Sequence, residues 1–391
     1  MYTATKGKVL PPTMAGSLPR PAWFNRNLAG QPLRAAMVDS LHREQYLDAV
    51  SSFIRDQERA GLDIVSDGDA RFDNDVGGRS WVSYVMERLD GVSDYHSAQY
   101  KYPRRNSQAM GSLLYEVHNS RVLPIVMEKI GPGHIELTQL WRCAQQMTSR
   151  PVKIGMVSPE QVGRMIPNVY YEDKAELIGV LCDIMNAEFH GLAAAGATVF
   201  QVEEPWVHRL DFQSSNIEAE AQESIGFFNR SVRGLRDKLE LWVHTSWGNP
   251  AQQRGGGFEE SYEPALAYMN ELEADVLTFE CASTGGMDLS SIAEHITGPK
   301  IGIGVINART LEVERPEDVA SLIRKALEVI PAERLCITTD TGFGREGMGR
   351  RHAFYKMVAL ARGTNIVRRE LGVPETYVPA ADPMFAIVDE E

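Results

Sequence analysis

Polar and charged residues follow short apolar segments at eight points along this 391-residue chain. In chain order they are Gly16-Ser17, Asp67-Gly68-Asp69, Ser158, Glu203-Glu204, His244, Glu280, Asn307 and Asp340. Buried segments gain no stability by ending in charged groups, unless these groups contact a ligand, a metal ion or one another. Any single member could instead face solvent or cap a helix. The complete series favours a shared polar site.

His244, Glu280 and Asp340 are the candidate catalytic residues of this series. An imidazole can bind a metal ion or transfer a proton near neutral pH. His244 and Glu280 end consecutive apolar segments, so their side chains could converge on half of a divalent-metal site. Carboxyl groups in different environments can also divide acid and base roles between them.

The adjacent pair Glu203-Glu204 leaves two alternatives open. Neighbouring residues of a strand point to opposite sides, so at most one of the two glutamates faces the site. The preceding residues Phe200, Gln201 and Val202 do not decide which one it is.

Cysteine usage and hydropathy indicate a cytoplasmic protein. The four cysteines are scattered without a Cys-x-x-Cys motif, so we expect no disulfide framework. No run of about 18 apolar residues and no secretory signal is visible, so we predict no membrane span. If Glu280 points into the barrel, the neighbouring Cys281 points toward the surrounding helices and is an unreactive core thiol.

The charge balance argues against a nucleic-acid partner. The formal net charge is −13, so the protein as a whole is not attracted to the negatively charged phosphate backbones of nucleic acids. No Gly-x-Ser-x-Gly, P-loop or dinucleotide-binding motif is present. We therefore expect a small-molecule substrate, and nothing in the composition sets the oligomeric state.

The elements that position these residues alternate between strands and helices. Nearly continuous apolar runs predict buried parallel strands at 8–15, 62–66, 152–157, 198–202, 239–243, 276–279, 301–306 and 335–339. Helical periodicity between them is clearest at 46–61, 173–196, 316–330 and 350–371. Eight such units predict an α/β fold, a single (β/α)₈ TIM barrel spanning residues 1–391 with its site at the carboxyl ends of the strands.

One connection is much longer than the others. About 80 residues separate the second and third predicted strands. Within them, residues 93–133 are polar and aromatic, and a connection of this length usually has a function. We predict a long insertion after the second strand, at about 93–133, which covers the mouth of the barrel.

Several motifs, in order, resemble the catalytic barrel of cobalamin-independent methionine synthase and its shorter, single-barrel relatives. The residues at 14–21 resemble that family's Gly-Ser-Phe-Pro-Arg strand, and those at 66–69 its Thr-Asp-Gly-Glu. The residues at 201–205 resemble Gln-Ile-Asp-Glu-Pro, and those at 244–249 His-x-Cys-x-Gly-Asn. Phe279-Glu280 and the Asp-Thr-Gly-Phe-Gly at 340–344 complete the match, which spans most of the chain.

The resemblance implies a metal site with an altered ligand set. The family binds zinc through His, Cys, Glu and a late Cys, which here correspond to His244, Ser246, Glu280 and Thr341. Both cysteines are thus replaced by hydroxyl residues, and neutral hydroxyls are poor zinc ligands. Zinc, a harder divalent cation such as magnesium or manganese, and no metal at all remain alternatives.

The resemblance also implies an amino-acid pocket. Ser17 would hold the substrate carboxylate, Asp69 and Glu203 would hold its ammonium group, and Arg20 of the same opening motif is a further substrate-binding candidate. Asp69 and Glu203 each differ by one methylene from the family residue. The family's general-acid histidine would fall near 307–309, where this chain has none.

Three hypotheses follow. The first is an enzyme that transfers a methyl or alkyl group to the thiol of a small polar acid, in the manner of methionine synthase but with an altered metal site. The second is a repurposed lyase or hydrolase that uses His and carboxylate acid–base chemistry or a hard divalent metal. The third is a binding protein that keeps the pocket without catalysis, since fold alone does not fix function.

Overall fold

The computed structural model describes residues 2–73, 80–93, 123–247, 260–344 and 348–385. Six parallel strands form a curved sheet in sequence order, each paired with the next in the chain. They are β3 (Ile154–Val157), β4 (Val199–Glu203), β5 (Glu240–His244), β6 (Val276–Phe279), β7 (Lys300–Gly304) and β8 (Leu335–Thr338). All six begin within two residues of the start of a predicted strand.

Two extended segments close this sheet into a ring. Pro12 pairs in parallel with Ile337 of β8, and Val65 pairs in parallel with Val152 just before β3. The amide of Asp63 donates to the carbonyl of Pro12 at 2.8 Å and joins the two segments. The backbone ladder therefore runs around eight chain segments, as expected for an eight-stranded barrel.

The predicted strands at 8–15 and 62–66 are wrong as regular strands, although both segments lie where strands were expected. Each takes part in the ring through an isolated bridge only. The reason on the first segment is local, since Pro11 and Pro12 have no backbone N–H to donate to a ladder. On that side, the segment at 62–66 can only donate its own N–H groups to carbonyls of the first segment, as Asp63 does to Pro12.

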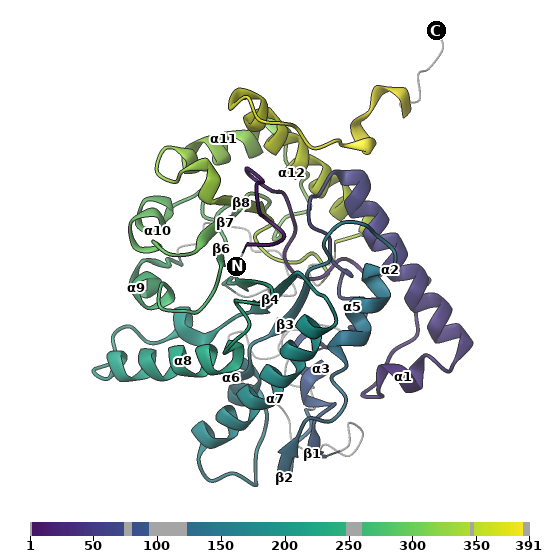
Figure 1. Ribbon diagram of the computed structural model, residues 1–391, viewed down its shortest axis with the longest axis vertical. Helices are drawn as coiled ribbons and strands as arrows, with labels where there is room; N and C mark the ends of the chain where they lie inside the picture. Colours follow the sequence, from purple (N-terminus) through teal and green to yellow (C-terminus); the bar gives the residue numbers. More distant parts are fainter. Residues whose placement is uncertain (1, 74–79, 94–122, 248–259, 345–347, 386–391) are drawn as a thin grey trace, which may run out of the picture.

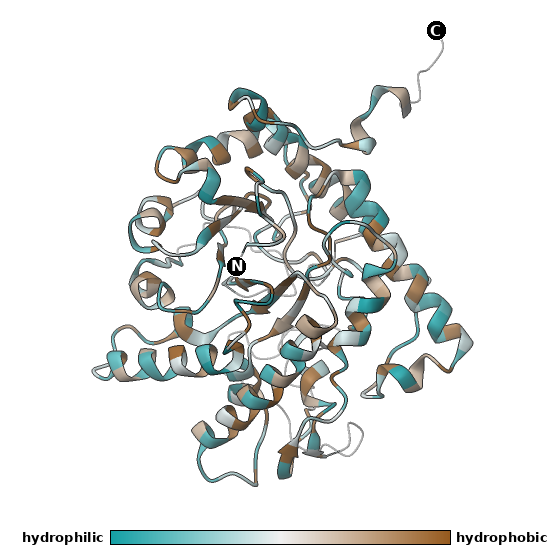
Figure 2. Cartoon of the chain, viewed as in Figure 1, coloured by the Kyte–Doolittle hydropathy of each residue, from teal (hydrophilic) through white to brown (hydrophobic). Residues whose placement is uncertain are grey.

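Helices surround the strands in Figure 1. The outer ring contains α2 (Ser40–Ala60), α5 (Leu137–Gln145), α6 (Pro159–Met165), α7 (Lys174–Ala194), α8 (Ile217–Val232), α9 (Leu266–Met269), α10 (Leu289–His295), α11 (Pro316–Leu327) and α12 (Arg350–Glu370). Shorter helices are α1 (Leu33–Ala36), α3 (Ser80–Met86), and the 3₁₀ turns Trp206–Arg209, Glu263–Ala265, Ala332–Arg334, Pro379–Ala381 and Pro383–Phe385. In Figure 2 the central strands are largely brown, whereas the outer helices carry mixed brown and teal faces.

Local sequence explains where these helices begin. α11 starts with Pro316 at its first position and has Glu317 and Asp318 in its first turn, where a fixed φ and negative charge are favourable. Val319 and Ile323 then bury one face against the barrel. By length and composition α7 could also cross a membrane, but it packs against α5, α6 and α8 as one of the barrel helices.

The long connection after the second extended segment contains a small antiparallel sheet. β1 (Asp90–Val92) pairs with β2 (Val126–Gly131), beside α3 in Figure 1. Most of the predicted insertion at 93–133 lies outside the described residues, and its described part includes β2. The prediction that it covers the barrel mouth stays a prediction.

The amino-terminal end of the barrel is closed by the start of the chain. The backbone amides of Thr3 and Thr5 donate to Oε2 of Glu240 at 2.8 and 2.9 Å. Trp242 Nε1 donates to the other oxygen of Glu240 at 2.9 Å, and Trp242 packs in an apolar layer with Ala4. In Figure 1 the N-terminus accordingly lies over the centre of the ring. These contacts lie at the end of the barrel opposite to the one where the sequence predicts the site.

Candidate active site

His244 is the last residue of β5 and lies beside Thr278 of β6 in the sheet register. Its Nδ1 is 3.0 Å from Thr278 Oγ1, and the whole side chain is buried. Burial lowers the pKa of His244 below its ordinary 6.5, although Glu204 and Glu203 act in the opposite direction. The ring is therefore neutral at pH 7. Its Nε2 is buried and has no hydrogen-bond partner among the described residues, so a ligand that bonds to it would satisfy a buried polar atom.

The structure resolves which glutamate of the adjacent pair faces the barrel interior. Glu203 accepts hydrogen bonds from Trp81 Nε1 at 2.6 Å and from Gln201 Nε2 at 2.9 Å. A Cβ atom on Gly155 of β3 would lie only 2.2 Å from Glu203 Oε1, so this carboxylate occupies space that a side chain on β3 would fill. Glu204 has a positive φ of 55° and turns its carboxylate into a different network.

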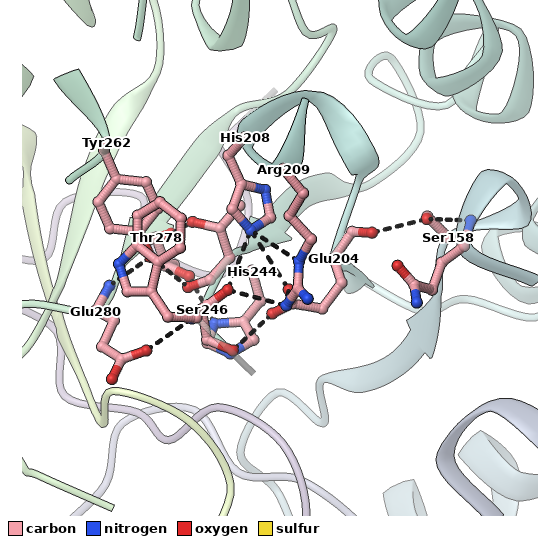
Figure 3. Close-up of polar contacts among 12 residues, drawn as sticks. Ser158, Glu204, His208, Arg209, His244, Ser246, Tyr262, Thr278 and Glu280 are labelled. Carbon is pink, nitrogen blue, oxygen red and sulfur yellow. Dashed lines mark hydrogen bonds and ion pairs between the residues drawn. The ribbon is translucent and has the colours of Figure 1, made fainter. Parts of the chain in front are cut away.

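Glu204 organises the loop that follows β4. Its carboxylate accepts from Arg209 Nη2 at 2.5 Å and from Ser246 Oγ at 2.9 Å. Figure 3 shows His208 and Arg209 directed toward Glu204 and Ser246, whose carbonyl accepts from both at 3.1 Å. Burial alone would raise the pKa of Glu204, but Arg209 and His208 hold it well below its ordinary value. Glu204 is therefore ionised, and the Ser246 hydroxyl is committed to it as a donor.

The carboxylate of Glu280 is fully engaged. Oε1 accepts from Arg309 Nε and from Ser283 Oγ, both at 2.7 Å. Oε2 accepts from Arg309 Nη2 at 3.0 Å and from the backbone amide of Trp247 at 2.9 Å. Both charged side chains are buried. The predicted catalytic Glu280 thus faces a guanidinium.

Asp340 lies beyond the end of β8 and binds backbone. Oδ1 accepts from the amides of Cys281 and Ala282 at 2.9 and 2.8 Å, and Oδ2 accepts from Ser283 at 2.7 Å. Burial and the neighbouring Glu280 raise the pKa of Asp340 to about 8, although these three N–H groups act in the opposite direction. In its present position Asp340 holds the loop after β6.

Ser17 and Asp69 lie on neighbouring loops at the same end of the barrel. The carbonyl of Ser17 accepts from the amide of Phe343 at 2.7 Å, and the amide of Leu18 donates to the carbonyl of Gly68 at 3.0 Å. Asp69 has a positive φ of 54° and accepts from buried Arg71 at 2.8 Å. Burial raises the pKa of Asp69 to about 8, with Arg71 acting in the opposite direction.

Arg20 belongs to the opening loop. Its guanidinium lies 3.6 Å from the centre of the Phe24 ring and donates to Asn27 Oδ1 at 2.8 Å. It also donates to the carbonyl of Phe72 at 3.2 Å. These contacts tie the loop after the first extended segment to the loop after the second.

Several residues of this network were missed by the sequence reasoning. They are Trp81, His208, Arg209, Thr278 and Arg309. His208 and Arg209 carry a detectable signal, since they lie within six residues of a strand end on a βα loop. Arg309 has the same signal, because it lies five residues past β7. At this position the sequence argument concerned only the absence of the family's general-acid histidine.

The residues that correspond to zinc ligands do not fit a zinc ion. Glu280 is occupied by Arg309, and the Ser246 hydroxyl donates to Glu204. Thr341 offers only a neutral hydroxyl, which binds zinc poorly. In the part of the chain that the structure describes, no group of three or more His, Cys, Asp or Glu side chains is placed to hold a metal ion.

A closed α/β barrel with ionisable groups at the carboxyl ends of its strands defines the class of (β/α)₈ barrel enzymes. Within that class, residues 10–363 match the model of the cobalamin-independent synthase catalytic domain, and the chain belongs to this family.

Relatives and solved structures agree with this assignment. The chain is 27% identical over 369 residues to a methionine synthase of Saccharolobus solfataricus, covering 94% of this chain and 97% of the relative. It is 28% identical over 365 residues to a methionine synthase of Thermococcus kodakarensis, covering 93% and 95%. A B12-independent methionine synthase from Shewanella, solved with selenomethionine, superposes with a TM-score of 0.73 at 24% identity, covering 93% of this chain and 99% of that one. That structure supports the fold.

Proposed function

We propose that this protein transfers a methyl or alkyl group to the thiol of a small polar acid, with His244 accepting the thiol proton. Family membership supports the reaction type, since its relatives are methionine synthases. The single observation that carries the role of His244 is its neutral, buried ring, whose Nε2 has no partner among the described residues.

The proposed step is a substitution at carbon. The thiol proton moves to His244 Nε2, and a lone pair on sulfur forms the new S–C bond. The bond between that carbon and the methyl or alkyl donor breaks, and the donor leaves with the bonding electrons. A base near neutral pH is suited to a thiol, whose ordinary pKa is about 8.5.

Acidic side chains near His244 would position an amino-acid substrate. Glu203 ends the strand beside β5, and the sheet register places it directly next to His244. Its carboxylate can accept from a substrate ammonium in addition to Trp81 and Gln201, because each oxygen has two lone pairs. Asp69 and Ser17 would complete this pocket from the neighbouring loops, as the family resemblance implies. Homocysteine is the first substrate to test.

A lyase or hydrolase is the second candidate. It is favoured by the loss of both thiolate ligands and by the engagement of Glu280 with Arg309, which together remove the family's means of activating a thiol. In such an enzyme His244 would abstract a proton from carbon or water.

The test is a thiol-alkylation assay. Purified protein is incubated with homocysteine, cysteine and other small thiol acids, each with a methylated folate or a simple methyl donor. We expect loss of free thiol and a methylated product by mass spectrometry with at least one pair. His244→Asn should slow product formation by about 10²–10⁴-fold, whereas the exposed His352→Asn should not change it. Absence of product from every pair, with the wild type folded, would favour the second candidate.

A further inference from the structure

We propose that the buried Arg309–Glu280 ion pair takes the place of a bound metal ion, so that this protein works without one. The inference does not depend on which reaction the site catalyses. It starts from the disagreement between the zinc ligands that the family resemblance implies and the contacts that these residues make.

The pairing of the two side chains is bidentate. Arg309 Nε is 2.7 Å from Oε1 of Glu280, and Nη2 is 3.0 Å from Oε2. The planar guanidinium matches the carboxylate in this arrangement, which makes such pairs strong and directional. The side chain of Glu280 is fully buried and that of Arg309 is only 5% exposed, so solvent does not screen the attraction.

The remaining acceptor positions of Glu280 are also filled. Ser283 Oγ donates to Oε1 at 2.7 Å, and the backbone amide of Trp247 donates to Oε2 at 2.9 Å. Each oxygen therefore accepts two hydrogen bonds, which matches its two lone pairs. A metal ion could reach this carboxylate only by displacing Arg309 or breaking these bonds.

Arg309 is held in place by the loop that carries it. Its backbone amide donates to Asn307 Oδ1 at 2.8 Å, and the amide of Asn307 donates to Glu314 Oε1 at 3.0 Å. Lys356 of α12 is fully buried and donates to the carbonyl of Asn307 and to both oxygens of Glu314, all at 3.0 Å. The guanidinium is thus part of a fixed network.

The charges of the corresponding ligands agree with this inference. The His244 imidazole carries no negative charge, and Ser246 and Thr341 offer neutral hydroxyls, so Glu280 is the one anion of the set. A guanidinium balances that single negative charge. A divalent ion would leave an excess positive charge in a buried site, which is unfavourable.

The experiment restores the cysteines with and without Arg309. The variants are Ser246→Cys/Thr341→Cys, the same pair with Arg309→Ala, and the same pair with Arg315→Ala as a matched control. Arg315 lies on the same loop as Arg309 but forms an exposed ion pair with Asp318. Zinc affinity is measured by competition with a chromophoric chelator, zinc content by elemental mass spectrometry, and folding by circular dichroism.

We expect the wild type to hold no stoichiometric zinc, magnesium or manganese after dialysis. Removal of Arg309 from the double-cysteine variant should strengthen zinc binding at least tenfold, because Glu280 becomes available as a ligand, whereas Arg315→Ala should not change it. Two results would overturn the inference: a tightly held equivalent of metal in the wild type, or equal zinc affinity with and without Arg309 in folded variants. Neither measurement uses activity, so failure of the proposed reaction would be recognised separately.

Discussion

The carboxylate of Glu203 on β4 lies against Gly155 of β3, and a Cβ atom on Gly155 would lie 2.2 Å from Oε1 of Glu203. No real contact is that short, so the carboxylate can turn into the barrel only because β3 has no side chain at this position. The glycine and the glutamate therefore form one structural unit of the site.

Gly155→Ala should displace Glu203 and destabilise the protein. We expect a loss of roughly 1–3 kcal/mol in the free energy of unfolding, as for other overpacked core positions, together with weaker substrate binding. Gly226 is the matched control, because it is exposed in α8 and a Cβ there would contact nothing within 4 Å. Gly226→Ala should stabilise by roughly 0.5–1 kcal/mol. Urea unfolding measures both, and equal stability of the two variants would contradict the packing argument.

His244→Asn should lower the rate of the catalysed reaction by about 10²–10⁴-fold while leaving the protein folded. Burial lowers the pKa of His244 below 6.5, so the base stays deprotonated through neutral pH. The wild-type rate should therefore stay constant down to pH 6.5 and decline only below it. A rate profile that already declines between pH 8 and 7 would be inconsistent with His244 as the base.

The same shift in the pKa of His244 has a consequence for stability. Because the pKa is lower in the folded than in the unfolded chain, the unfolded chain binds more protons just below pH 6.5. Stability should therefore decrease as the pH falls through 6.5, and this contribution should vanish in His244→Asn. Urea unfolding at pH 7 and pH 5.5 compares the two proteins.

Glu204→Gln should destabilise the loop after β4. The variant loses the charged partner of Arg209 and His208, and we expect a loss of about 1.5–3 kcal/mol at pH 7. The depressed pKa of Glu204 means that its contribution is present above its ordinary 4.5 and is lost as the pH falls below that value. The difference between wild type and variant should therefore shrink under acid conditions.

Glu370→Gln provides the control for this prediction. Glu370 forms a comparable ion pair with Arg324, at 2.7 Å, but both side chains are nearly half exposed. Exposed ion pairs contribute little to stability, so this variant should unfold like the wild type. A larger effect at Glu370 than at Glu204 would show that burial does not govern these pairs.

Lys153→Met should stabilise the protein. Lys153 Nζ is buried 4.2 Å from the centre of the Trp242 ring and has no hydrogen-bond partner among the described residues. Burial lowers the pKa of Lys153 from 10.5 to about 7, although Glu203 acts in the opposite direction. Each unit of such a shift corresponds to about 1.4 kcal/mol, so an apolar side chain of similar length should add a few kcal/mol.

The pH dependence distinguishes this effect from simple packing. Between about pH 7 and 10.5 the unfolded chain binds the proton of Lys153 and the folded one does not, so wild-type stability should rise across that range. Lys153→Met should lack this rise, whereas the exposed Lys174→Met should keep it. Denaturant unfolding at pH 7 and pH 9.5 gives the comparison, and identical slopes for all three proteins would contradict the shift.

The sequence by itself determined the class of fold, and it predicted the end of the barrel where the candidate site lies. Nearly continuous apolar runs predicted the positions of all six regular strands, because parallel strands that are buried on both faces consist mainly of apolar residues. Because the carboxyl ends of parallel strands meet at one edge, the order of strand ends was enough to bring His244 and Glu280 together. The proline pair at 11–12, which limits two segments to single bridges, was also visible in the sequence, but its effect on the ladder was not predicted.

Only the tertiary structure decided how each of these groups is used. The position of the Glu203 carboxylate depends on the missing side chain of Gly155, which lies on another strand, and Glu204 leaves the strand with a positive φ. The hydrogen bonding of the Glu280 carboxylate depends on Arg309, which lies 29 residues away and looks like an ordinary loop arginine in the sequence. Both are contacts between segments distant in the chain, and local periodicity carries no information about such contacts because it reports only which face of one element is buried.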